Sequence, residues 1–182
     1  MKKENVAVEN PFMCNPFDVF GLEPSFNIDL KALDKIYFDL QKKHHPDQRN
    51  VDNVLSFESD ASMINASYQK LKHPLKRAEA LLNLLSLPLE DAESSDPSGV
   101  LASVFEFQEA LALCEDEEEA LAIKEDIDEA FITEQARFGE LFDQGHYEEL
   151  PEIYIKMSYL NRLREHMKDI EENFFKRKSV LH

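Results

Sequence analysis

The chain has 182 residues, of which 43% are hydrophobic, and a formal net charge of −17 from 37 acidic and 20 basic side chains. That length suits one ordinary domain or two small ones, and only four Gly leave little scope for a turn-rich sheet fold. A strongly acidic surface repels phosphate backbones, so we expect no nucleic-acid partner. Because no segment approaches the ~20 apolar residues of a membrane span and the N-terminal sequence lacks a signal-peptide pattern, we expect no membrane partner and a cytoplasmic location.

The two cysteines, Cys14 and Cys114, lie far apart and form neither a CxxC pair nor a zinc-spaced cluster. They are expected to be unpaired thiols in a reducing compartment. We predict no metal and no cofactor. The chain also has no P-loop, GxGxxG, GxSxG or HExxH motif, so it is not expected to be an enzyme. The acidic run at 115–119 lacks the Gly and alternating ligands of an EF-hand and indicates a solvated helix junction.

The N-terminal residues 1–12 are polar and unpatterned, which predicts a flexible tail. Asn15 and Pro16 are the residue types that favour a helix cap and a first helical position. Gly21 is expected to end this short helix, because Gly readily adopts the left-handed conformation found after helix ends.

The next helix, expected between a cap at Asp29 and about His44, has one apolar and one basic face. Its apolar-face residues recur at spacings of three and four: Leu33, Tyr37, Leu40 and His44. Lysines make the stretch a positive island in an acidic chain: Lys31, Lys35, Lys42 and Lys43. This island predicts either a docking surface for an acidic partner or a solvated helix face. Pro46 cannot continue the helix, so a loop begins at His45.

Two further helices are expected before the middle of the chain, at about 52–72 and 75–85, with Pro74 between them. The apolar residues of the first repeat at helical spacing and predict antiparallel packing on the preceding helix: Ile64, Tyr68 and Leu71.

The segment 87–99 contains two Pro, one Gly, three Ser and four acidic residues, a composition typical of linkers. Beyond it, periodic segments at 100–114, 117–144 and 147–176 predict three helices, with Gly145 separating the last two. Long helices joined by short turns predict a three-helix bundle.

The residues His45-Pro46-Asp47 stand in a loop between a basic-faced helix and its antiparallel partner, and this setting resembles the J-domain. The segments NPFDVFGL at 15–22 and YQKLKHPLKRAE at 68–79 are similar to the first helix and the third-helix exit of HscB-type J-proteins. The resemblance extends over about residues 13–178.

The resemblance implies an all-α, L-shaped molecule. Its implied parts are a J-domain helical hairpin at 13–84, a linker at 85–98 and a C-terminal three-helix bundle at 99–178.

HscB-type J-proteins bind an IscU-type iron–sulfur scaffold, deliver it to an HscA-type ATPase chaperone and stimulate that chaperone's ATPase, which aids maturation of iron–sulfur proteins. By this resemblance the chaperone and the scaffold are the expected partners. The chaperone-binding residues are expected in the loop and the basic helix: His45, Pro46, Asp47, Arg49, Lys35, Lys42 and Lys43. Gln48 stands where J-domains often have Lys, and Arg49 is expected to replace the missing charge.

The scaffold-binding residues implied by the resemblance are Leu101, Ala102, Phe105, Glu106, Glu109 and Tyr159. One apolar stripe of this helix is enough for bundle packing, and it comprises Val100, Val104, Phe107 and Leu111. Leu101 and Phe105 lie on a neighbouring stripe, which predicts an exposed interaction patch. Ala102 is smaller than the Met usual in the family. The alternative is that both stripes are core or pack on the J-domain.

Two other functions stay open. A J-protein for a different client would use the bundle as a dimerisation module, and a weak homo-oligomer is considered with either reading. A metal hydrolase would need His44, His45 and Asp47 as ligands. Adjacent histidines cannot face inward together from one helix, however, and no second His/Asp cluster completes such a site.

Overall fold

The computed structural model describes residues 15–43, 54–87, 102–114 and 116–180. Within these residues the regular secondary structure is helical and no strand occurs, so the predicted all-α fold class is confirmed. The flexible tail expected at the N-terminus and most of the expected linker lie outside the described residues. The L shape stays a prediction.

Two compact units make up the chain, one formed by residues 1–24 with 28–73 and the other by residues 25–27 with 74–182. The units part between His73 and Pro74, whereas the sequence placed the following helix in the first domain. The physical reason is that this helix packs against the last helix of the chain. The domain bounds drawn from the sequence stay a prediction.

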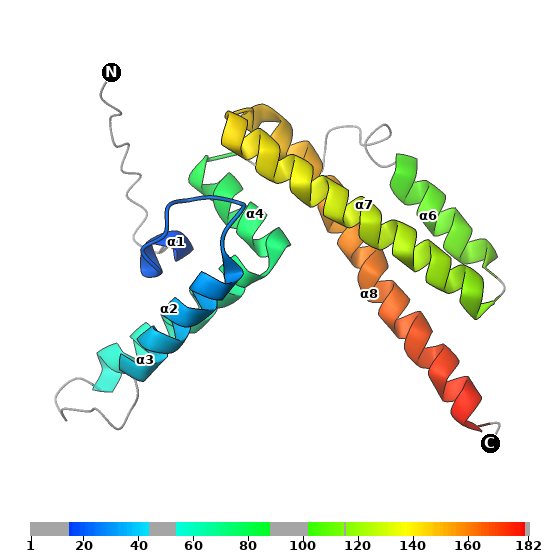
Figure 1. Ribbon diagram of the computed structural model, residues 1–182, viewed down its shortest axis with the longest axis horizontal. Helices are drawn as coiled ribbons and strands as arrows, with labels where there is room; N and C mark the ends of the chain where they lie inside the picture. The colour runs from blue at the N-terminus through cyan, green and yellow to red at the C-terminus, as the bar shows by residue number, and fades with distance from the viewer. Residues whose placement is uncertain (1–14, 44–53, 88–101, 115, 181–182) are drawn as a thin grey trace. The chain divides into compact units, whose positions relative to one another are not determined.

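The first unit consists of α1 (Pro16–Val19), α2 (Leu30–Lys43) and α3 (Val54–Lys72). α2 and α3 run antiparallel and side by side, as expected from their apolar spacing (Figure 1). Their core contacts come from side chains that are fully buried or nearly so: Phe17, Phe20, Leu33, Ile64, Tyr68 and Leu71.

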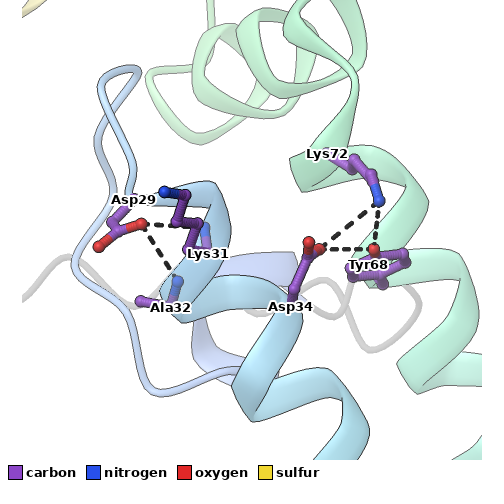
Figure 2. A network of polar contacts seen from close by, with 6 residues as sticks. All are labelled: Asp29, Lys31, Ala32, Asp34, Tyr68 and Lys72. Carbon is purple, nitrogen blue, oxygen red and sulfur yellow. Dashed lines mark hydrogen bonds and ion pairs between the residues drawn. The ribbon is translucent and has the colours of Figure 1, made fainter.

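Local capping chemistry sets the starts of α1 and α2. The Asn15 side chain accepts a hydrogen bond from the backbone N–H of Phe17 at 3.0 Å. The Asp29 carboxylate accepts from the backbone N–H groups of Lys31 and Ala32 at 2.9 and 3.1 Å (Figure 2). These bonds satisfy N–H groups that have no partner inside the first helical turn, and both predicted caps are confirmed.

The second unit consists of α4 (Pro74–Leu84), α6 (Ala102–Leu113), α7 (Glu117–Gln144), a short 3₁₀ turn η2 (Tyr147–Glu149) and α8 (Leu150–Val180). α7 and α8 form its long antiparallel pair, and α6 lies along α7 (Figure 1). Asp116 caps α7 by accepting from the N–H of Glu119 at 2.9 Å. Gly145 ends α7 in the left-handed region at φ 79°, which confirms the predicted break.

Apolar residues from α7 and α8 form the centre of this unit. The largest fully buried side chains among them are Ile127, Phe131, Phe138, Leu150, Met157, Leu160 and Met167. Among the described residues of α6, only Val104 is fully buried. The third helix of the bundle is therefore held by a much smaller apolar contact than the other two.

The segment 25–27 joins the second unit through Phe26. The Phe26 ring is 3% exposed and lies 4.8 Å from the Phe138 ring, centroid to centroid. The Arg77 guanidinium lies 4.9 Å from the Phe26 ring centre, within reach of a cation–π attraction. Gly139 leaves room for this segment, because a Cβ there would lie 2.6 Å from the Asn27 Nδ2.

A partly buried ion pair links α7 to α8. Lys156 Nζ donates to Glu134 Oε1 at 2.6 Å, and the Glu134 side chain is only 8% exposed. Its second oxygen, Oε2, is buried without a hydrogen-bond partner among the described residues. The Glu134 carboxylate is therefore paired with the Lys156 ammonium through one of its two oxygens.

Replacing Lys156 with Met is expected to destabilise the second unit by about 3 kcal/mol, because the buried Glu134 carboxylate then loses its Lys156 partner. Urea unfolding of the full chain measures this loss. Arg137→Met is the matched control, since the Arg137–Glu149 pair is about half exposed on both sides. Such pairs contribute less than about 1 kcal/mol. Equal losses in the two variants would contradict this account of the buried pair.

Candidate docking surfaces

The loop residues expected to bind the chaperone, His45, Pro46, Asp47 and Arg49, lie outside the described residues. The three expected lysines lie within them, on the exposed surface of α2 or at its end: Lys35, Lys42 and Lys43. The structure therefore describes the basic helix that precedes these residues, and their role stays a prediction.

α2 presents distinct faces to the unit core and to solvent. Leu33 is fully buried, and Tyr37 and Leu40 are partly buried on the same side. The exposed side carries Lys31, Lys35 and Lys42, together with Phe38, whose side chain is 60% exposed. For the described residues, the apolar and basic faces predicted for this helix are confirmed, and the predicted apolar-face residue His44 lies outside them.

A polar network fixes α2 to α3 on one edge of the basic face (Figure 2). The Tyr68 hydroxyl donates to Asp34 Oδ1 at 2.7 Å and accepts from Lys72 Nζ at 2.6 Å. The ammonium of Lys72 also lies 3.5 Å from Asp34 Oδ1. The negative charge that Asp34 would bring to α2 is thus balanced by a lysine of α3.

Tyr37 extends this contact along the same helix pair. Its ring stacks on Tyr68 with centroids 4.0 Å apart and planes 15° from parallel. Its hydroxyl donates to Asn65 Oδ1 at 2.9 Å, and Gln41 Nε2 donates to the same oxygen at 2.7 Å. Because these bonds lie on successive turns of α2, they restrain its rotation against α3 and keep the lysines outward.

The hydrogen bond from Tyr68, with the charge of Lys72, lowers the pKa of Asp34 below its ordinary value of 3.8 despite opposing desolvation. The pKa of Lys72 is raised for the corresponding reasons, with Tyr68 again the largest cause. A carboxyl with a lowered folded pKa stabilises the fold fully above its unfolded pKa. The carboxyl loses that contribution to stability as the pH falls through its pKa in the folded state.

Asp34→Asn is therefore expected to lower the stability of the first unit at neutral pH. The difference in stability between the variant and wild type should shrink once the pH falls below about 3.8, the ordinary pKa of the carboxyl. Thermal melts followed by near-ultraviolet circular dichroism suit this test, because the stacked Tyr37 and Tyr68 report on the interface and the chain has no Trp. A stability difference that stays constant as the pH is lowered into the acid range would contradict the stabilising role of the ionised Asp34 carboxylate.

The expected scaffold patch lies on α6, although Leu101 falls outside the described residues. Phe105 is 57% exposed, while Val104 beside it is 1% exposed. The structure thus assigns Val104 to the core and leaves Phe105 on the surface, as the two-stripe prediction requires for these residues. The other expected residues of this helix are also exposed: Ala102, Glu106 and Glu109.

Sequence reasoning missed Leu113, which is 71% exposed at the end of α6. It follows Glu109 by one helical turn, so it continues the line of exposed residues that begins at Ala102. The sequence did contain the signal for this exposed residue, since Leu113 is apolar and stands four positions after the acidic Glu109. Tyr159 on α8 is partly exposed and lies under the guanidinium of Arg162 at 5.0 Å from the ring centre.

No group of described His, Cys, Asp and Glu residues is arranged to hold a metal ion. Cys114 is a free thiol that donates to the backbone oxygen of Asp116 at 3.2 Å, and Cys14 lies outside the described residues. No described helix is both long enough and apolar enough to cross a membrane.

Comparison with known proteins shows what this chain is similar to. The family model of the HSCB C-terminal oligomerisation domain matches residues 96–168. Chaperone HscB from Vibrio cholerae is similar over 88% of this chain and 99% of its own, with 27% identity and a TM-score of 0.75. The human co-chaperone HscB covers 89% of this chain and 84% of its own, with 27% identity and a TM-score of 0.78. The chain is similar to HscB co-chaperones in sequence and in fold.

The HscB resemblance predicted from the sequence is thereby confirmed. The Jac1 co-chaperone from Saccharomyces cerevisiae has the same fold, with a TM-score of 0.71 over 87% of this chain and 94% of its own, at 24% identity. The HscB family model covers α6, α7 and most of α8. It therefore spans the described part of the candidate scaffold patch and does not include the basic helix α2.

Proposed function

We propose that this chain is a non-enzymatic adaptor of iron–sulfur cluster assembly. Its first unit docks on an HscA-type chaperone and stimulates ATP hydrolysis by that chaperone. Its second unit binds an IscU-type scaffold and delivers it as the client. Each unit carries one docking surface, so the two partners are bound by separate parts of the chain.

The chaperone contact combines a loop with a positive helix. Pro46 restricts the backbone of the loop, which lowers the entropy lost on docking. The Asp47 carboxylate can then form a short, bidentate contact with an Arg of the chaperone. The exposed lysines of α2 attract an acidic chaperone surface, and salt screens this attraction.

The scaffold contact is an apolar stripe with acidic residues along it. Phe105 and Leu113 are large, exposed apolar residues of α6, and Glu106 and Glu109 lie between them. Such a stripe fits a partner with an apolar surface and basic residues near it. Ala102 leaves more space than a Met would, so the partner can approach that turn of the helix more closely.

The observation that carries the proposal is the contrast between Val104 and Phe105. Val104 is 1% exposed and Phe105 is 57% exposed, so α6 packs one apolar face against the bundle and exposes a second one that a partner can bind. A helix that served only the bundle would need the first face alone.

A second candidate is a J-protein for a different client, with the bundle as a dimerisation module. The description of the matched family model as an oligomerisation domain favours it. The exposed Ile132 and Leu121 on α7 supply apolar surface for self-association, even without α6.

One titration separates the two candidates. The chaperone's ATPase rate is measured while this protein is added, first alone and then with the scaffold, and the mass of this protein in solution is measured over the same concentrations. The adaptor predicts stimulation that the scaffold increases, with the chain active as a monomer. If the protein is a dimer that stimulates the chaperone, and the scaffold does not change the ATPase rate, the second candidate is established instead.

A further inference from the structure

An exposed aromatic ring lies within the basic face of α2. Phe38 is 60% exposed, more than any other described aromatic side chain of the first unit. A single exposed apolar residue is ordinary on a protein surface. Its surroundings set Phe38 apart, because lysines precede and follow it on the same face.

Helical geometry places this ring in line with three lysines. With 3.6 residues per turn, Lys31, Lys35, Phe38 and Lys42 fall within about 60° of one another around the helix. All four side chains are exposed. The ring therefore lies between Lys35 on one turn and Lys42 on the next, and a partner that contacts both lysines must cover it.

The acidic residues near this stripe do not cancel its charge. Asp34 lies on one edge and is bound to Tyr68 and Lys72 of α3, which direct its carboxylate away from the stripe (Figure 2). Asp39 is exposed on the other edge and is the one opposing charge there among the described residues of α2. Three lysines against one aspartate leave the stripe positive in a chain of net charge −17.

We infer that Phe38 is an apolar anchor in the contact with the chaperone, seated in an apolar hollow of an acidic surface. The inference rests on the proposed function and adds a specificity residue to it. The lysines supply attraction at long range, and the ring supplies contact area once water is excluded. A partner with acidic residues but no hollow at this place would leave the ring in water and bind more weakly.

The test replaces Phe38 with Gln, which favours helix and leaves the lysines in place. We expect the concentration of this protein that half-maximally stimulates the chaperone's ATPase to rise about tenfold, because a buried Phe contributes on that scale. The maximal rate should not change. The ratio between variant and wild type should also be the same at low and high salt, whereas the loss caused by Lys35→Gln should shrink as salt screens it.

Met63→Gln is the matched control, since Met63 is a 38% exposed apolar residue on α3 of the same unit. It should leave the half-maximal concentration unchanged. If Phe38→Gln keeps wild-type affinity while Asp47→Asn still abolishes stimulation, the inference about Phe38 is overturned and the proposed function stands. A lower maximal rate at unchanged affinity, or a change only in self-association, would also overturn it. A wild-type protein that never stimulates the chaperone would remove the proposed function and this inference together.

Discussion

Asp47→Asn is expected to abolish stimulation of the chaperone's ATPase while leaving the first unit folded. The substitution keeps the shape of the side chain and removes the charge that an Arg partner requires. A charge-assisted hydrogen bond contributes roughly 1.5–3 kcal/mol, which corresponds to about a ten- to hundredfold loss in the coupling step. Steady-state ATPase assays measure the loss, and a thermal melt of the same sample tests the fold.

Asp39→Asn is the matched control for this loop variant. It removes the same charge from an exposed position on α2, at the edge of the lysine stripe. Stimulation should persist, with a slightly tighter contact because the face becomes more positive. His45→Gln should act like Asp47→Asn, since the loop is proposed to work as a unit. Scaffold binding should survive both loop changes, and its loss would contradict the assignment of the two surfaces to different units.

The second large effect is expected on α6. Replacing Leu101 and Phe105 together with Ser should weaken scaffold binding by roughly tenfold to a thousandfold, because two apolar anchors commonly contribute a few kcal/mol to an interface. The bundle should stay folded, since Phe105 is more than half exposed. Calorimetric titration with the scaffold and a thermal melt of the same protein decide the outcome.

Ile132→Ser supplies the control for the α6 variant. Ile132 is 63% exposed on α7, so it matches Phe105 in exposure and lies on another helix of the same unit. It should leave scaffold affinity unchanged. If the α6 double variant melts much earlier than wild type, the two residues contribute to the core and the patch assignment is wrong. Stimulation of the chaperone by the α6 variant without scaffold should equal that of wild type.

Features that depend on neighbouring residues could be predicted from the sequence. The caps at Asn15 and Asp29 and the helix end at Gly145 were predicted because each depends on side-chain or backbone chemistry within one turn. The faces of α2 followed from residue spacing. The exposed position of Phe105 followed in the same way, because one apolar stripe was enough for the bundle.

Features that depend on distant partners could not be predicted. No local pattern indicates that Asp34 would meet Tyr68 and Lys72, or that Glu134 would pair with Lys156. Each requires the register of two packed helices, which spacing within one helix does not specify. For the same reason the sequence did not show that Phe26 packs with the second unit.

Two exposed apolar residues were overlooked for a different reason. Leu113 and Phe38 are ordinary helix residues by composition, and their importance depends on exposure within a charged stripe. Extending the predicted α6 face by one turn beyond Glu109 would have included Leu113. Phe38 lies within the predicted basic face of α2, between Lys35 and Lys42, and was not counted because it is not a lysine. The exposed stripe of α6 therefore extends to Leu113, and that of α2 includes Phe38.

The central claim is that this chain couples a scaffold protein to a chaperone's ATP hydrolysis. Its most direct test is the steady-state ATPase rate of an HscA-type chaperone with this protein, measured with and without an IscU-type scaffold. The account predicts that the protein alone accelerates hydrolysis and that adding scaffold accelerates it further than either component does by itself. A rate that stays at the chaperone's basal value in the presence of both proteins would contradict it.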